Sequence, residues 1–466
     1  MPQKIFYISF SKIIYSETQN ELIMSKINEE ENNEELTPEE TSFSDLIETN
    51  LDRFIEELSA LNDTLPIQMV MLKIKHKELI KKLEKISTTS EEIDEDGNEI
   101  VRYRVAFDDI EEFPKIHKRL NRADIAKKII PRNFIVSIVS QYDAFLGDLV
   151  RIIYDINPNL IRSSEKELNP SDLFNFDSIE DLKLHIVDKE VDSLLREEHL
   201  EQLKVLEKRI SKVTKNEFHL TKNLPVLKEF VELTQRRNLF VHTNGLVTRQ
   251  YLDINHKWKF KGCESSLNDE LRAQPEYCEN SYRILFEMSV KLTHVLWRKF
   301  LPKDRDRADK HLNQIIYDLL VDSEYNLAVI ISDFCTNSIK KFSSEQLRKF
   351  IVINKAIACK LLDKKDMCNS IIENEDWSIG NEFKLAKLVL QDKFEDAKRL
   401  MIKIGPEDDL LDKNAYNNWP LFKVFRKTKE FQTAYFELFD EEFSLEEIQN
   451  KEVVEKEKDL DINDLE

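Results

Sequence analysis

Three polar side chains that could act together, Arg237, Asn238 and His242, lie close to one another in the stretch RRNLFVHTNG (residues 236–245). If this stretch is helical, Asn238 and His242 lie about 40° apart, and Arg237 extends the set to a fan of roughly 140° of helix surface. Because Asn244 and Gly245 form a typical left-handed helix stop, we expect His242 to lie in the last turn.

A histidine in the last turn of a helix is suited to proton transfer. The negative end of the helix dipole favours an imidazolium there, and histidine can donate or accept a proton near neutral pH. The competing interpretation is structural, because polar residues at a helix end, taken without context, more often form a solvated or capping cluster. Arg236, the first residue of the stretch, is expected on the surface.

The surrounding sequence predicts a compact bundle of helices that would position this set. One helix is expected to begin at Pro131, since proline favours the first turn. It carries Ser140 and Asp143 on a stripe of small or polar residues, which would let another helix approach closely. The segment 246–275 is expected to be a small non-helical insertion. Further bundle helices are predicted over residues 181–212, 224–242 and 280–301.

At the arginine, asparagine and histidine the sequence resembles the HEPN superfamily (higher eukaryotes and prokaryotes nucleotide-binding domains). The motif of that family is an arginine, a polar residue that is frequently asparagine, three to five further residues and a histidine at a helix end. Arg237 and Asn238 are followed here, after three residues, by His242. The resemblance covers about residues 131–303 and implies a small helical bundle. Ser140 and Asp143 lie where such domains often carry an accessory acidic residue.

The resemblance implies a metal-independent endoribonuclease that cleaves RNA through its 2′-hydroxyl group. His242 would act as the general base or acid. Arg237 would stabilise the negative charge on phosphorus in the transition state, and Asn238 would orient the phosphate or the imidazole. DNA lacks the 2′-hydroxyl group and should resist. A nuclease of this kind would serve as a toxin or defence effector, in a toxin–antitoxin pair or in phage defence.

The resemblance also implies an assembly, because one helix offers a single histidine and two protomers of the family pack their motif helices together. We therefore expect a homodimer with a composite site. The alternative is a non-catalytic module. In that case the bundle would only dimerise or bind RNA, and the C-terminal helices would bind a regulatory protein partner.

Other chemistries have weaker support in the sequence. Arg305 and His311 also satisfy the bare arginine–histidine spacing, but they fall in a charged stretch (303–311) that is expected to be a linker. No glycine-rich phosphate loop, nucleophile elbow or metal-ligand spacing occurs, so no cofactor and no metal are expected.

The fold class that follows is mostly α, with an N-terminal helical region, the central bundle and an α-solenoid-like C-terminal region. In the N-terminal region two helices, or one long helix broken near Pro66, would precede a β-hairpin with an Asp-Gly turn. The C-terminal region repeats an apolar helix, an Asp-Lys turn and a second apolar helix at an offset of 29 residues. The predicted divisions are an acidic disordered N-terminus (1–42), the N-terminal region (43–130), the bundle (131–303), the repeat-like region (304–439) and an acidic disordered tail (440–466).

Composition places few limits on function. The formal charge is −20, but the two acidic ends carry most of it, so a local basic groove for RNA remains open. Five cysteines without a CxxC pair favour reduced thiols in a cytoplasmic protein. No apolar run is long enough to span a membrane. Met24 precedes an acidic stretch, and a start there would make the first 23 residues an extension.

Overall fold

The computed structural model describes residues 38–93, 99–162, 176, 178–260, 265–408 and 410–444. These residues are mostly helical, as the sequence predicted. They divide into two compact units, one with the described residues up to His311 and one with those from Leu312 onwards. The predicted divisions at residues 130 and 303 do not coincide with this boundary. Apart from the first residues of α2, the predicted acidic ends lie almost entirely outside the described residues.

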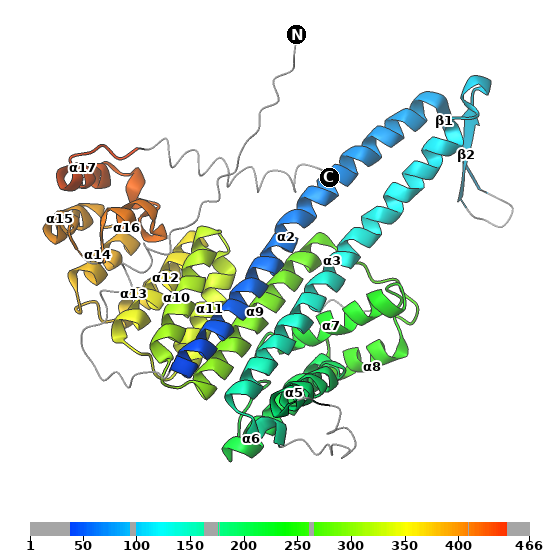
Figure 1. Ribbon diagram of the computed structural model, residues 1–466. Coiled ribbons are helices and arrows are strands. Elements are labelled where there is room, and N and C mark those ends of the chain that lie inside the picture. The colour runs from blue at the N-terminus through cyan, green and yellow to red at the C-terminus, as the bar shows by residue number, and fades with distance from the viewer. Residues whose placement is uncertain are drawn as a thin grey trace, which may run out of the picture. The chain divides into compact units, whose positions relative to one another are not determined.

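Two long helices, α2 (Pro38–Ile86) and α3 (Phe113–Ile156), run side by side through the first unit (Figure 1). Both contain an interior proline, Pro66 in α2 and Pro131 in α3. The predicted helix start at Pro131 is therefore wrong, because α3 begins 18 residues earlier. An interior proline costs about 3 kcal/mol, and the apolar contacts that continue on both sides of each proline outweigh that cost. Near the end of α2 and the start of α3, their inner faces meet in a cluster formed by Leu79, Leu83, Ile116 and Ala123.

The connection between these helices contains the only strands among the described residues, β1 (Ser87–Ile93) and β2 (Glu99–Val105). They pair antiparallel, with Ser87 opposite Val105 and Ile93 opposite Glu99. The predicted Asp-Gly turn falls at residues 96–97, outside the described residues. A short 3-10 helix, η1 (Phe107–Asp109), leads into α3.

The remaining helices of the first unit pack around the second half of α3. Tyr142 and Phe145 of α3 contact Phe54 of α2, and Tyr142 also meets Phe230 of α7 edge to face. The expected non-helical insertion is wrong, because residues 249–258 form a helix that Thr248 caps by accepting a hydrogen bond from the Tyr251 amide. These helices are α4 (Asn159–Arg162), α5 (Ile179–Leu195), α6 (His199–Thr214), α7 (Leu227–His242), α8 (Arg249–Trp258) and α9 (Pro275–Phe300).

The charged stretch predicted as a linker is instead the start of a helix, α10 (Arg305–Val321). Asp309 is fully buried and forms an ion pair with Arg298 of α9 at 2.6 Å. His311 is also buried, and its Nε2 lies 2.8 Å from Asp52 Oδ1 of α2. Charge alone did not reveal the helix, because these charges are paired inside the unit instead of facing water.

The second unit consists of short helices joined by tight turns. The two predicted helix–turn–helix segments are present as α12–α13 and α14–α15, and Asp363 and Asp392 take left-handed backbone angles in their turns (φ 55° and 57°). The α-solenoid itself stays a prediction. The helices are α11 (Tyr325–Ser338), α12 (Glu345–Leu361), α13 (Lys365–Asn374), α14 (Asn381–Leu390), α15 (Phe394–Ile404), α16 (Lys413–Asn418) and α17 (Lys429–Phe439), with 3-10 turns η3 (Pro420–Phe422) and η4 (Phe425–Lys427).

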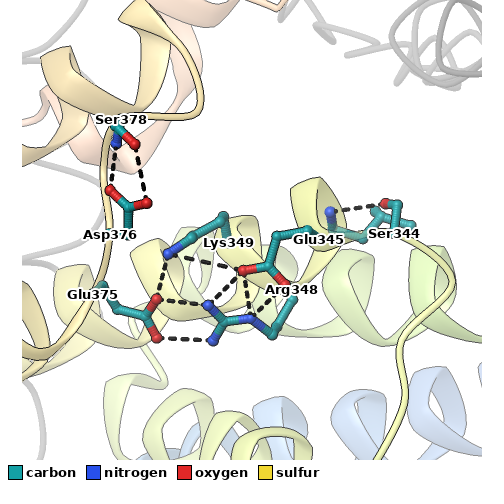
Figure 2. Close-up of polar contacts among 8 residues, drawn as sticks. Ser344, Glu345, Arg348, Lys349, Glu375, Asp376 and Ser378 are labelled. Carbon is teal, nitrogen blue, oxygen red and sulfur yellow. Dashed lines mark hydrogen bonds and ion pairs between the residues drawn. The ribbon is translucent and has the colours of Figure 1, made fainter.

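A charged cluster ties α12 to the segment after α13. Figure 2 shows Arg348 and Lys349 of α12 reaching the carboxylate of Glu375. Arg348 also donates to Glu345, one turn earlier in the same helix. Lys349 is almost fully buried, at 1% exposure. The carboxylates of Glu375 and Glu345 therefore compensate its positive charge inside the unit.

Candidate active site on helix α7

Helix α7 ends where the sequence predicted. It spans Leu227–His242, and Thr243 closes it by donating its backbone N–H to the Leu239 carbonyl. Asn244 and Gly245 follow with positive φ angles of 55° and 87°. A Cβ at Gly245 would come within 2.9 Å of the Leu271 carbonyl oxygen, so glycine is required both for its backbone angle and for space. His242 therefore lies in the last helical turn.

Asp143 of α3 joins Arg237 to a histidine from a third helix. Its Oδ2 accepts a hydrogen bond from Arg237 Nη2 at 3.0 Å, and its Oδ1 lies 2.8 Å from Nε2 of His199, the first residue of α6. Arg237 Nη1 donates in turn to Asn238 Oδ1 at 3.2 Å. The structure thus brings together three of the predicted residues, Arg237, Asn238 and Asp143, and adds His199.

This network is half-buried. The side chains of Arg237 and Asp143 are 21% and 25% exposed, and Arg237 Nε is buried without a hydrogen-bond partner among the described residues. Beneath it, burial raises the pKa of the Tyr142 phenol, and the neighbouring Asp143 carboxylate raises it further. The phenol therefore stays neutral, and the Asp143 carboxylate and the Arg237 guanidinium carry opposite charges next to it. A buried, neutral side chain lowers the local polarity, which strengthens the neighbouring ion pair between Asp143 and Arg237.

His242 lies outside this network. It is exposed, and it has no hydrogen bond or ion pair with another described residue. It follows Arg237 by five residues, which places it about 7.5 Å further along the helix and about 140° round it. The imidazole is therefore open to a ligand, whereas the Arg237 guanidinium is already held by protein groups.

Ser140 does not join the network either. Its side chain is exposed, and its Oγ donates to the Val136 carbonyl at 2.8 Å, one turn earlier in α3. Of the two accessory residues that the sequence suggested, Asp143 is in contact with Arg237 and Ser140 is not.

His199 could not be found from sequence spacing. It lies 56 residues from Asp143, and no short motif links the two. The sequence offered one weak signal: a side chain at the first position of a helix can contact a neighbouring helix.

The predicted surface position of Arg236 is wrong. Arg236 is buried, its Nε donates to Glu232 Oε1 at 2.7 Å, and its guanidinium lies 4.1 Å from the ring centre of Tyr277. Glu232 also accepts hydrogen bonds from the hydroxyls of Tyr251 and Tyr277, both at 2.8 Å. A buried arginine is stable here because its charge is paired and its face is stacked.

Helix α3 also reaches the end of α7. Arg132 Nη1 donates to the Asn244 carbonyl at 2.7 Å, and the guanidinium lies 5.9 Å from the Phe240 ring centre. Lys128, one turn earlier, contacts Glu270 at 3.4 Å. The exposed end of α7 that carries His242 is therefore bordered by cations of α3.

A possible metal-binding group and a cavity lie outside this site. Among the described residues, Glu48, Asp52 and His311 are the side chains with metal-ligand spacing, and their ligand atoms lie within 4.8 Å of one another. Arg307 already forms an ion pair with Glu48, which competes with a cation. A cavity of about 180 Å³ lies between α2 and α3, but none of the candidate catalytic residues lines it. The four described cysteines are buried and form no disulfide with one another.

The comparisons with known proteins leave the resemblance as a hypothesis. The chain matches no protein-family model, no curated protein and no solved structure. Among the described residues, no helix combines the length and the apolar character that crossing a membrane requires.

Proposed function

We propose that the protein is a metal-independent, HEPN-type endoribonuclease whose active site is Arg237, Asn238 and His242. The observation that carries this proposal is the Asp143–Arg237 ion pair at 3.0 Å, with Asn238 at its edge. This ion pair orients Arg237. The same helix carries His242, which is exposed and has no hydrogen bond or ion pair with another described residue. Cleavage at a phosphodiester requires an oriented cation and a free proton-transfer group, and helix α7 carries both.

In the proposed reaction the 2′-oxygen of RNA attacks the adjacent phosphorus atom. His242 takes the proton from the 2′-hydroxyl, the bond from the 2′-oxygen to phosphorus forms, and the bond from phosphorus to the 5′-oxygen breaks. The leaving 5′-oxygen receives a proton from a second acid. The products are a 2′,3′-cyclic phosphate and a 5′-hydroxyl. Arg237 and Asn238 contact the phosphate, and Asp143 is a positioning residue that orients Arg237.

The second acid follows most simply from a homodimer. Each copy offers one exposed histidine at the end of α7, so two copies with these ends together supply a base and an acid. Sedimentation of the wild type should show a dimer. A monomer that cleaves RNA at full rate would contradict the composite site while leaving the cleavage proposal intact.

A second candidate function is a non-catalytic module that dimerises or binds RNA. The observation that favours it is that Asp143 already neutralises Arg237 and also contacts His199. A network satisfied in this way can serve stability alone. In this case the helices from α10 to α17 would bind a regulatory protein partner.

Cleavage of a structured RNA in EDTA separates the two functions. Wild type, Arg237→Ala and His242→Ala proteins are incubated with the RNA, and the ends of the fragments are mapped. The nuclease proposal expects cyclic phosphate ends from the wild type and none from either variant. His256→Ala is a matched control, because His256 is an exposed helical histidine of the same unit. Equal RNA stability with all four proteins would contradict the proposal.

The biological role can be tested by induced expression. A toxin or defence effector should arrest growth, and His242→Ala should relieve the arrest whereas His256→Ala should not. Arrest that persists with His242→Ala would contradict the toxin role, even if weak cleavage is measured.

A further inference from the structure

The distal parts of α2 and α3 form an arm that extends past α7 and α9 of the same unit, with β1 and β2 at its far end (Figure 1). The arm is defined here as residues 67–86 of α2 and 113–132 of α3. The buried cluster of Leu79, Leu83, Ile116 and Ala123 holds the two helices together, so the remaining sides of both helices face solvent.

The arm is strongly basic although the chain is acidic. Residues 113–132 hold seven lysines and arginines and one aspartate, and residues 71–86 hold six lysines and two glutamates. The aspartate, Asp124, is already paired with His76 and Lys127. In a chain with a formal charge of −20, this excess of cations over acids produces a local positive field that attracts polyanions.

The cations of α3 follow one line. Lys115, Lys118 and Arg122 lie three and four residues apart, within about 60° of helix surface. All three are exposed, and none has an ion pair with another described residue. The alternating spacing of three and four residues, which repeats every seven residues, continues to Ile125 and Ile129. These side chains are 55% and 38% exposed. A line of this spacing drifts by only about 20° per seven residues, so it stays on one side of the helix.

This line leads to the candidate active site. Its next positions are Arg132, which binds the Asn244 carbonyl just after His242, and further on Asp143, which binds Arg237. Helix α7 therefore covers the line between Arg132 and Asp143 and leaves it open from Ile129 to Lys115. The distance along α3 from Lys115 to Arg132 is about 26 Å, close to eight steps of a nucleic-acid strand at about 3.4 Å each.

We propose that the open line on α3, from Lys115 to Arg132, binds the phosphate backbone of the RNA strand whose scissile phosphate lies at His242. The assignment to RNA rests on the proposed function, whereas the preference for a polyanionic backbone rests on the charges and their line. An anionic membrane surface fits less well. The exposed Phe107 at the far end of the arm is followed by Asp108, Asp109, Glu111 and Glu112, which such a surface would repel.

Binding is tested without cleavage by using the His242→Ala background. The line variant combines Lys115→Glu, Lys118→Glu and Arg122→Glu. The control combines Lys340→Glu, Lys384→Glu and Lys393→Glu, three exposed lysines of the second unit, and changes the net charge by the same amount. Affinity for a labelled RNA stem-loop is measured over a range of salt concentrations, and thermal melting checks the fold. If the line variant does not fold, glutamine replaces glutamate at the same three positions.

The proposal expects the line variant to bind roughly 100-fold more weakly at about 0.1 M salt, with a salt slope smaller by about 2 to 3, and the control to bind as the parent does. Equal losses in both variants, or no loss in the line variant, overturn it. DNA of the same sequence bound as tightly overturns the assignment to RNA. Flotation with phosphatidylserine vesicles, lost in the line variant while RNA binding persists, shows a membrane element instead and also overturns it.

Failure of this inference can be told apart from failure of the nuclease proposal. If the wild type leaves RNA intact but the line variant loses RNA binding, the nuclease proposal falls and the binding line stands. If the wild type cleaves RNA and the line variant binds it unchanged, the nuclease proposal stands and the binding line falls.

Discussion

The Asp143 carboxylate of α3 accepts a hydrogen bond from Arg237 of α7 at 3.0 Å, and the two residues are 94 positions apart in the chain. Because both side chains are less than a third exposed, this contact links the two helices and also fixes the direction of the guanidinium. Its loss should therefore affect both stability and catalysis.

Asp143→Asn should lower the free energy of unfolding by about 1 to 3 kcal/mol, since a charged hydrogen bond is lost and Arg237 keeps its buried charge. It should also slow RNA cleavage by about tenfold or more, which corresponds to about 1.4 kcal/mol of transition-state stabilisation. Urea unfolding and cleavage rates measure the two effects. The control is Asp148→Asn on the same helix, whose ion pairs with Arg53 and Arg151 are more exposed and should contribute less than about 1 kcal/mol.

Arg236 and Arg237 are adjacent but should respond in opposite ways. Arg236→Ala removes the buried partner of Glu232 and the cation over Tyr277, so the free energy of unfolding should fall by about 3 kcal/mol. Arg237→Ala should destabilise less and abolish cleavage. Melting temperature and cleavage are measured on both variants. A larger stability loss in Arg237→Ala than in Arg236→Ala would contradict these assignments.

Acid should destabilise the first unit through His294. Burial lowers the pKa of His294 well below 6.5, and the nearby charges of His311 and Arg298 lower it further. The folded state therefore favours the neutral imidazole. The stabilisation is fully present above about pH 6.5 and is lost as pH falls below it, by at most about 1.4 kcal/mol per pH unit. His311 Nδ1 lies 3.3 Å from His294 Nε2, and the other ring nitrogen of His311 lies 2.8 Å from Asp52 Oδ1.

Replacement of His294 by phenylalanine should flatten this pH dependence and keep the stacking on Trp297. The measurement is the melting temperature between about pH 7.5 and about pH 5, compared with the wild type and with His256→Phe as an exposed control. A wild-type melting temperature that rises towards acid, or an unchanged slope in His294→Phe, would rule out this role.

What could be predicted from the sequence was local. The end of α7 was predicted because Asn244 and Gly245 favour positive φ angles by themselves. Helices and helical pairs were predicted because apolar spacing reports each helix separately. The interior position of Pro131 was not predicted, because the packing of α2 on α3 decides whether a helix continues through a proline.

What could not be predicted depends on contacts between distant segments. The burial of Arg236 depends on Tyr277, 41 positions later, and His199 meets Asp143 only because α6 packs beside α3. The stretch 303–311 was predicted to be a linker because it is highly charged. Its composition does not show that Asp309 and His311 have partners on α9 and α2. No short-range pattern reports such pairs.

In the second unit, Glu375 should matter more for stability than the buried Lys349 that it neutralises (Figure 2). Burial works against the charged form of Glu375, but the hydrogen bonds from Arg348 and Lys349 lower its pKa. Glu375→Gln would leave the Lys349 ammonium buried beside Trp377 with only Glu345 at 3.9 Å. We expect a loss of about 3 kcal/mol.

Lys349→Met removes the buried charge and leaves Glu375 with both of its hydrogen bonds from Arg348. It should therefore change stability by less than about 1 kcal/mol, and the double variant should be more stable than Glu375→Gln alone. Hydrogen–deuterium exchange of the α12 peptide reports the local stability in all three proteins. If Lys349→Met accelerates exchange as much as Glu375→Gln does, the ammonium contributes more than its desolvation costs, and the claim that Glu375 matters more is contradicted.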